Sequence, residues 1–209
     1  MGMTFGKNHP RGFTLIEIVV VIAIIAVLAG ILTPIVSKYI KESKAARALA
    51  DLKRIHAALG AFYSDRNLKG IWPIYIDPIL PLNEDNHLYL LIGPGRDAGV
   101  EGEGRELFNE LGGWPAEKID RLENHLLYNR PPVNQYKNWG GPYITKITAD
   151  PWGNHYSVNV KYLTNFYPQE GEVTWVISGG MNKTWETAFS QLNDDNITID
   201  GDDMVSRIE

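Results

Sequence analysis

The chain has 209 residues, enough for one domain with a hydrophobic core plus an appendage. Its 20 basic and 25 acidic side chains give a net charge of −5. This acidic balance argues against the basic surface that nucleic-acid binding requires, so no nucleic-acid partner is expected. The absence of cysteine excludes disulfides, thiolate metal sites and a cysteine nucleophile.

Residues 13–36 form an apolar run in which Glu17 is the single charged side chain. As a helix, about 20 such residues cross the roughly 30 Å hydrocarbon core of a bilayer. The run therefore predicts a transmembrane helix, and it is too long for the apolar core of a secretory signal peptide. Charge alone leaves the orientation open, because both ends carry basic residues: Lys7 and Arg11 before the run, and Lys38, Lys41 and Lys44 after it.

The junction Arg11-Gly12-Phe13-Thr14-Leu15-Ile16-Glu17, followed by an unbroken apolar helix, resembles the prepilin leader junction of type IV pilins and of type II secretion pseudopilins. The resemblance implies that residues 1–12 are a leader and that a prepilin peptidase cuts after Gly12 on the cytoplasmic side. It also implies that the new amino group of Phe13 is methylated. The chain would then cross the inner membrane once, with its N-terminus cytoplasmic and its C-terminal domain periplasmic.

Two explanations are open for Glu17. In the first, Glu17 lies near the helix end, reaches the membrane interface and favours the positive end of the helix dipole. In the second, which rests on the resemblance, Glu17 pairs with the cationic amine of Phe13 from a neighbouring subunit in an assembled filament. An ionisable residue inside a membrane favours this second, functional explanation. Because an unpaired buried charge is costly, such a pair would fix the register of the subunits.

Beyond Ser37, apolar residues recur at spacings of three and four, which predicts an amphipathic helix over residues 37–65. One helix from Phe13 to about Asp65 is therefore expected, with its second half packed on a globular domain. Pro34 removes one backbone hydrogen bond and should bend or loosen the helix near Gly30. The resemblance implies that this segment loses helical structure when subunits pack in a filament. The predicted apolar face comprises Ala45, Ala48, Leu49, Leu52, Ile55, Leu59, Phe62 and Tyr63.

Residues 66–138 form a variable region of loops and helix that matches no part of the family pattern. Prolines over Ile71–Leu82 predict an irregular loop, and His87–Ile92 can form a short strand or a helical turn. The apolar pattern over Ala116–Tyr128 predicts a helix. This region could decorate the filament surface or contact substrates.

Residues 139–209 are predicted to be rich in β-structure. The stretches Trp139-Gly140-Gly141-Pro142-Tyr143 and Asp150-Pro151-Trp152-Gly153-Asn154 resemble two aromatic elements of the major pseudopilin of type II secretion. The second stretch has the composition of a turn. Strands over 156–160 and 172–177 should follow it as an antiparallel hairpin against the helix. Packing in the core is the expected role of the two tryptophans.

In that family a loop after the last hairpin strand and a terminal acidic element hold a calcium ion. The resemblance implies that Ser178, Asn182, Asp202 and Asp203 are the calcium ligands here, together with loop carbonyl oxygens. Asn182 stands where an aspartate is expected, and a neutral ligand lowers calcium affinity. A solvated acidic tail without metal is the alternative.

The expected fold class is α+β: a long N-terminal α-helix, half transmembrane and half amphipathic, packed on a small antiparallel β-sheet domain. The main functional hypothesis is a structural subunit of a pilus-like filament, the major pseudopilin that drives protein export across the outer membrane. It would polymerise through its N-terminal helix, with Glu17 and Pro34 as assembly residues. Its partners would be the prepilin peptidase, the inner-membrane assembly platform and minor pseudopilins.

Two alternatives are a type IV pilin for adhesion, motility or DNA uptake, and a membrane-anchored binding module that never polymerises. No enzyme is expected, because the five histidines are scattered and no serine lies in a nucleophile motif.

Overall fold

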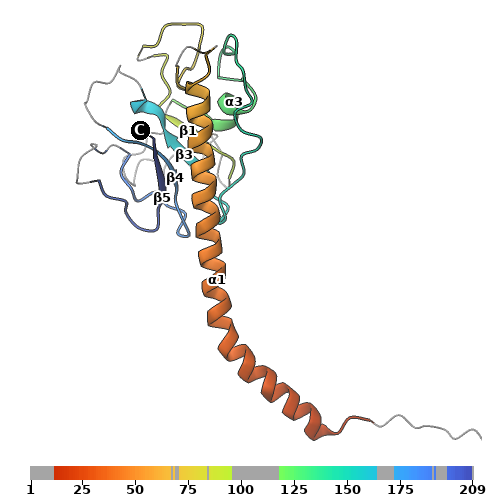
Figure 1. Cartoon of the computed structure of the whole chain (residues 1–209). Coiled ribbons are helices and arrows are strands. Elements are labelled where there is room, and N and C mark those ends of the chain that lie inside the picture. Colours follow the sequence, from red (N-terminus) through yellow and green to blue (C-terminus); the bar gives the residue numbers. More distant parts are fainter. Residues whose placement is uncertain are drawn as a thin grey trace, which may run out of the picture. The chain divides into compact units, whose positions relative to one another are not determined.

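The computed structural model describes residues 12–66, 68, 71–83, 85–95, 118–163, 172–189, 191 and 197–208 (Figure 1). The leader residues 1–11 therefore lie outside the described part of the chain. Contacts divide the chain into two compact units, residues 1–43 and residues 44–209.

Helix α1 (Leu15–Tyr63) is the longest element, and its first part belongs to the N-terminal unit. The apolar side chains of this part are exposed along its length, from Leu15 to Ile40. Within the described residues α1 is the one helix whose length and composition would allow it to cross a membrane. The helix continues through Pro34, so the single chain keeps helical structure at the position where a bend or loosening was predicted.

The last part of α1 belongs to the second unit and buries one face. The predicted amphipathic helix is confirmed, although α1 ends at Tyr63, two residues earlier than expected. Leu49 and Tyr63 are 43% and 42% exposed, so these two members of the predicted face do not join the core. Ala58 takes a place in it instead. The buried residues are Ala48, Leu52, Ile55, Ala58, Leu59 and Phe62.

Five strands form one sheet in the order β2-β1-β3-β4-β5. Their bounds are Leu90–Ile92 for β1, Ile119–Arg121 for β2, Tyr156–Asn159 for β3, Thr174–Ser178 for β4 and Met204–Ile208 for β5. The predicted hairpin is confirmed as β3 and β4, which pair antiparallel with Val158 opposite Val176. The sheet is mixed rather than wholly antiparallel, because β2 pairs with β1 in the parallel direction.

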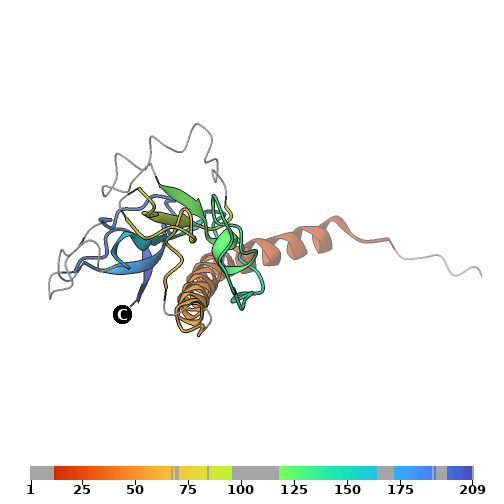
Figure 2. The same ribbon diagram turned by 90° about the horizontal axis from the view of Figure 1, so that it is seen from above.

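The sheet buries both of its faces. Side chains alternate along a strand, so Tyr156 and Val158 of β3 join the core shared with α1, while Trp175 and Ile177 of β4 join a second core on the opposite face. Figure 2 shows the C-terminal part of α1 nearly along its axis, beside the sheet. The α+β expectation is thus confirmed, with α1 packed on a small sheet.

The helix predicted over Ala116–Tyr128 is wrong in its first half, as far as the structure describes it. Lys118 has a φ of 54°, a left-handed conformation that interrupts a helix. Residues 119–121 then pair with β1, and a short helix α3 (Leu122–Leu126) follows. A 3₁₀ turn, η1 (Val160–Tyr162), follows β3. Strand pairing between distant segments has here overridden a local helical pattern.

Candidate functional site

The predicted cleavage junction lies before the start of α1. Gly12 and Phe13 are non-helical and exposed, and the Phe13 side chain is 82% exposed. A Cβ atom added to Gly12 would meet no atom of the described residues within 4 Å, so the described part of the fold does not itself require glycine there. A requirement for glycine at position 12 would therefore come from a protein that binds this junction, such as the predicted prepilin peptidase. Cleavage after Gly12 and methylation of Phe13 stay predictions.

Glu17 belongs to the first turn of α1, where it forms a reciprocal pair with Thr14. The Thr14 N–H and Oγ1–H both donate to Glu17 Oε2, each at 2.8 Å, and the Glu17 N–H donates to Thr14 Oγ1 at 3.3 Å. The Thr14 carbonyl accepts a hydrogen bond from the Ile18 N–H at 3.4 Å. These contacts make Thr14 the N-cap residue of a capping box, which satisfies amide groups that a helix start otherwise leaves unpaired.

The capping box refines the first explanation of Glu17. The carboxylate does lie at the positive end of the helix dipole, but a specific partner also holds it. The sequence Thr14-Leu15-Ile16-Glu17 has the Thr-x-x-Glu spacing of this motif. Thr14 was not among the predicted site residues, although the Thr-x-x-Glu spacing identifies it as an N-cap.

Pro34, the other predicted assembly residue, has no hydrogen-bond donor to offer Gly30. The hydroxyl of the preceding residue, Thr33, donates to the Ala29 carbonyl at 2.7 Å. A Cβ atom on Gly30 would meet no atom of the residues that the structure describes within 4 Å. The single chain thus keeps its helix here while lacking one backbone bond, and the role of Pro34 in assembly stays a prediction.

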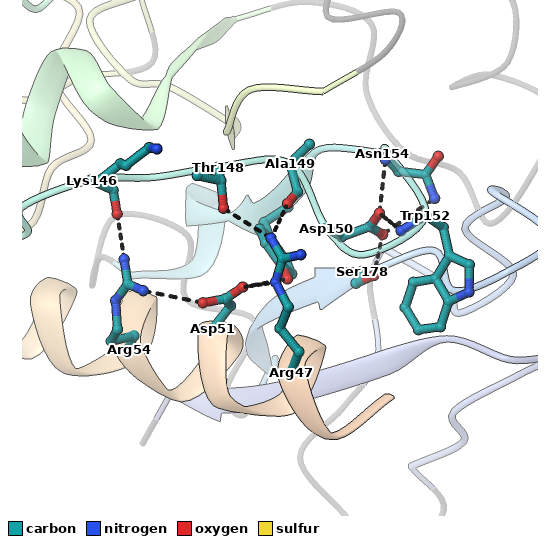
Figure 3. Close-up of polar contacts among 11 residues, drawn as sticks. Arg47, Asp51, Arg54, Lys146, Thr148, Ala149, Asp150, Trp152, Asn154 and Ser178 are labelled. Atoms are coloured by element: carbon teal, nitrogen blue, oxygen red, sulfur yellow. Dashed lines mark hydrogen bonds and ion pairs between the residues drawn. The ribbon is translucent and has the colours of Figure 1, made fainter. Parts of the chain in front are cut away.

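In the second unit, two arginines of α1 connect the helix to the loop that precedes β3 (Figure 3). Arg47 donates to Ala149 O at 3.4 Å, and Arg54 donates to Lys146 O. Asp51 lies between the two arginines, at 3.6 Å from Arg47 Nε and 3.2 Å from Arg54 Nη1. Because the arginines are more than half exposed, each ion pair alone adds little stability. Together they fix the loop against the helix at two points.

Asp150 is the centre of the turn formed by the second aromatic element. It is 3% exposed, and its Oδ1 accepts the N–H groups of Trp152 at 2.9 Å and Asn154 at 2.8 Å. Its Oδ2 accepts the Ser178 hydroxyl at 2.7 Å and Asn154 Nδ2 at 3.2 Å. Asn154 Nδ2 also donates to Gly180 O at 3.0 Å. The turn therefore holds the end of β4 and the loop that follows it, as Figure 3 shows for Ser178.

The first aromatic element packs at the C-terminal end of α1. Asp65, just beyond the helix, accepts hydrogen bonds from the Tyr143 hydroxyl and from the Gly140 N–H. Burial and the neighbouring carboxylate of Asp65 raise the pKa of Tyr143, so its hydroxyl keeps its proton. Trp139 packs edge-on against Tyr143 and donates its indole N–H to His125 O at 3.1 Å. The expected packing role of Trp139 is confirmed, since it adjoins the main core.

His125 lies at the centre of a buried polar chain in the variable region. Its Nε2 is 2.9 Å from Asp120 Oδ2, and its Nδ1 is 2.6 Å from the Tyr136 hydroxyl. Burial raises the pKa of Tyr136 well above its usual value. The His125 ring is fully buried. The chain joins β2, α3 and the following loop, and its geometry is that of a structural connection.

The predicted calcium ligands are brought to one acidic loop region. Asp202 Oδ2 accepts N–H groups of residues 181–182 at 2.5 and 3.1 Å. Asp203 Oδ2 accepts N–H groups of residues 186–187 at 2.8 and 2.6 Å. Gly180 has a φ of 59°, and a Cβ atom there would lie 2.3 Å from the Asp202 carbonyl oxygen. Only glycine therefore permits this close approach.

The four predicted ligands fit a calcium ion unequally. In the described part of the chain, the Oδ1 atoms of Asp202 and Asp203 are buried and have no hydrogen-bond partner, as oxygens intended for a cation would be. Ser178 donates its proton to Asp150, and Asn182 Oδ1 accepts the Thr184 N–H at 2.9 Å. Among the described residues, no three His, Cys, Asp or Glu side chains converge as metal ligands.

Glu186 is an acidic neighbour of these residues that was not among the predicted calcium ligands. Its Oε2 accepts Asn182 Nδ2 at 2.9 Å and the Asp202 N–H at 3.3 Å. Burial raises the pKa of Asp203, and the negative charge of Glu186 adds a smaller effect in the same direction. Glu186, Asp202 and Asp203 thus lie in the same loop region, although among the described residues they do not converge as a set of metal ligands. Glu186 lies in the segment between the two family-like elements, where the resemblance offered no guide.

Comparison with known proteins finds one family match for the N-terminal region of the chain and another for the region that contains most of the sheet. Residues 7–33 match the prokaryotic N-terminal methylation motif, and residues 119–183 match type II secretion system protein G. The second match contains both aromatic elements and ends before Asp202. No solved structure gave a significant match.

The most extensive of these similarities are to type II secretion system core protein G. The protein of Pseudomonas aeruginosa is 29% identical over 152 residues, which cover 72% of this chain and 73% of that protein. The protein of Escherichia coli is 27% identical over 71% of each chain. Fimbrial protein EcpC of Eikenella corrodens is 40% identical, but over 32% of this chain and 42% of its own length.

The methylation motif, the exposed apolar helix and the small sheet packed on α1 together define a pilin-like, membrane-anchored filament subunit with one N-terminal apolar helix. Within that class, the protein G match over residues 119–183 and the two protein G relatives support a type II secretion major pseudopilin. Pseudopilins and pilins are structural subunits that assemble into filaments after processing at the N-terminal motif.

Proposed function

We propose that this protein is the major pseudopilin that polymerises into the filament of a type II secretion system and pushes exported proteins across the outer membrane. The observation that carries the proposal is the extent of the protein G similarity, which includes β2, α3, β3, β4 and both aromatic elements. The chain acts as a structural subunit rather than as an enzyme. No nucleic-acid partner is part of the proposal.

Assembly depends on the N-terminal unit. The leader is removed after Gly12 by the prepilin peptidase, Phe13 is methylated, and Glu17 pairs with the cationic amine of Phe13 in a neighbouring subunit. The N-terminus is cytoplasmic and the second unit is periplasmic. The assembly platform of the inner membrane and minor pseudopilins are the further partners. The exposed apolar side chains along α1 support the proposal, because they need cover from lipid or from neighbouring helices.

Two measurements test this proposal. Mass spectrometry of the membrane-extracted protein should find a mature terminus at N-methylated Phe13, and a terminus at Gly30 would contradict the cleavage. Electron microscopy of cells that overproduce the chain together with a type II secretion system should show filaments that require Glu17. A Glu17→Gln variant that polymerises as well as the wild type would contradict the proposed pair.

The alternatives give different outcomes in the same cells. A type IV pilin would form surface filaments that support adhesion, motility or DNA uptake without restoring protein export. A membrane-anchored binding module would stay monomeric with or without Glu17. Export restored in cells that lack their own major pseudopilin would exclude both.

We further propose that the acidic loop binds calcium. The buried Oδ1 atoms of Asp202 and Asp203 support this, since neither has a hydrogen-bond partner among the described residues. Calcium takes six to eight oxygen ligands, so loop carbonyls and Glu186 would complete the set. Ser178 and Asn182 are the weaker candidates, because their side chains already have partners. The bound ion would offset the repulsion among three carboxylates.

The calcium proposal is tested with the full-length chain in detergent micelles. All six tryptophans lie after residue 71, so their fluorescence follows unfolding of the second unit alone. Millimolar calcium should raise the melting temperature of the wild type and leave that of Asp203→Asn unchanged. In the presence of a chelator, Asp203→Asn should be as stable as the wild type or more so, because the variant no longer buries a charge. An unchanged wild-type melting temperature in calcium would remove the site.

A further inference from the structure

Two lysines follow the apolar run of α1 within the N-terminal unit. Lys38 and Lys41, here called the interfacial lysines, are exposed, and Tyr39 between them is 66% exposed. At a rise of 1.5 Å per residue, their Cα atoms lie about 3 and 8 Å beyond Val36, the last residue of the run. The headgroup layer on each side of a bilayer is roughly 5 to 8 Å thick. A helix that spans the membrane with residues 13–36 therefore places both lysines in this layer or at its edge.

The helix directs both lysine side chains back towards the membrane. In an α-helix each Cα–Cβ bond tilts towards the N-terminus, so these side chains lean over the preceding turn and towards the apolar run. Tyr39 suits the same depth, because aromatic rings with a polar group gather at membrane interfaces. Among the described residues, the ion pair at this place joins Lys38 to Glu42 at 3.8 Å, and both side chains are more than half exposed. Such an exposed pair is weak, so it leaves Lys38 able to bind another anion.

The charge of the chain changes sign beyond the apolar run. Residues 37–47 hold four basic side chains and one acidic one, whereas residues 48–209 hold 14 basic and 23 acidic ones. An anionic surface therefore attracts the segment next to the membrane and repels the rest of the chain. A second copy of this chain is the competing partner, since its acidic residues also complement lysines. The membrane is favoured, because the apolar run carries the lysines into the headgroup layer with or without a neighbouring subunit.

We propose that the interfacial lysines bind the phosphate groups of anionic phospholipids and thereby fix the depth of α1 in the membrane. The inference goes beyond the proposed function. It requires only a membrane-anchored chain, holds for either orientation of the helix and does not depend on filament formation. Each lysine near an anionic surface strengthens binding roughly fivefold. A subunit that leaves the membrane must break these contacts, so anionic lipid holds unassembled subunits in the bilayer.

The test is native mass spectrometry of the full-length chain in neutral detergent micelles that contain equal amounts of phosphatidylglycerol and phosphatidylcholine. The wild type should retain phosphatidylglycerol in preference by roughly fivefold or more. Lys38→Gln/Lys41→Gln should retain the two lipids within about twofold of each other, whereas Lys38→Arg/Lys41→Arg keeps the charge and should keep the preference. The matched control is Lys137→Gln/Lys146→Gln, which removes the same charge from exposed positions of the second unit and should retain lipid as the wild type does.

Equal retention of the two lipids by the wild type would overturn the proposal. A loss as large in the control pair would also overturn it, because net charge and not position would then set the preference. If the glutamine pair at 38 and 41 kept the preference but lost self-association, the lysines would face a second copy of this chain, and the lipid contact would be wrong. At 1 M salt the wild-type preference should fall, since screening shortens the range of charge interactions to about 3 Å. A preference that salt does not change would contradict an electrostatic contact.

Discussion

Replacing Asp150 should destabilise the second unit far more than replacing another loop aspartate. The Asp150 carboxylate accepts four hydrogen bonds, two from backbone N–H groups and two from the side chains of Asn154 and Ser178. Each hydrogen bond to a charged group contributes about 1.5 to 3 kcal/mol, and the four share partners, so they do not add fully. We expect Asp150→Ala to lower the free energy of unfolding by about 4 kcal/mol.

The Asp150→Asn variant distinguishes the contribution of one carboxylate oxygen from that of the other. An asparagine can still accept the two backbone N–H groups, but its amide nitrogen would face Asn154 Nδ2, so one donor would meet another. The expected cost is about 2 kcal/mol. Asp200→Asn is the matched control, because the Asp200 side chain is exposed and should change stability by less than about 0.5 kcal/mol.

The assay is urea unfolding of the full-length protein in micelles, followed by tryptophan fluorescence. The free energies are compared only if the slopes of the transitions agree, since a changed slope would indicate a different unfolded or folded state. A loss of unfolding free energy below about 1 kcal/mol for Asp150→Ala would refute the reasoning, because removing four hydrogen bonds to a buried carboxylate should destabilise the fold by more than this.

Three further predictions use the same assay. Burial lowers the pKa of His87 to about 4 from 6.5, with smaller effects of Lys118 and Lys161, so its stabilising contribution is present above pH 6.5 and is lost as the pH falls towards 4. The wild type should therefore lose about 2 kcal/mol relative to His87→Gln over that range, and parallel pH curves would contradict this. Tyr143→Phe should cost about 1 kcal/mol through the lost bond to Asp65, whereas a cost near zero would show that this bond adds nothing. Leu52→Ala, in the fully buried helix face, should cost about 2 to 5 kcal/mol, and a value under 1 would place Leu52 outside the core.

Local sequence patterns predicted the elements whose signal lies within their own residues. The apolar run gave a helix, and spacings of three and four gave the buried face of α1. The turn at Asp150 and the alternating strand after it gave the β3–β4 hairpin. In each case the pattern and the final environment agree, because the same residues that favour the element also supply its buried face.

The parallel pairing of β2 could not be predicted in the same way. Residues 119–121 carry a helical pattern together with the segment that follows them, and they become a strand only because β1 offers an edge about thirty positions earlier in the chain. Strand β5 is a different case. Residues 204–208 read Met-Val-Ser-Arg-Ile and lack the apolar–polar alternation that predicts a strand, so β5 depends on its pairing with β4.

The candidate sites also differ in whether their residues are adjacent in the sequence. Glu17 and the cleavage junction were recognised from adjacent residues, and the capping partner Thr14 carried a readable signal that was missed. Asp202 and Asp203 were predicted as members of an acidic site. The proximity of Glu186 to Asp202, however, depends on how the chain between them folds back. No local pattern specifies that distance.

The position of the helix start has a consequence for processing itself. Because α1 begins at Leu15 and is capped by Thr14, the peptide bond between Gly12 and Phe13 precedes every hydrogen bond of the helix and its cap. A cut there would exchange a basic leader for a single amine while leaving α1 and its cap unchanged. Precursor and mature subunit would then share the same helix α1 and differ in electrophoretic charge. Maturation would be an electrostatic event and not a refolding.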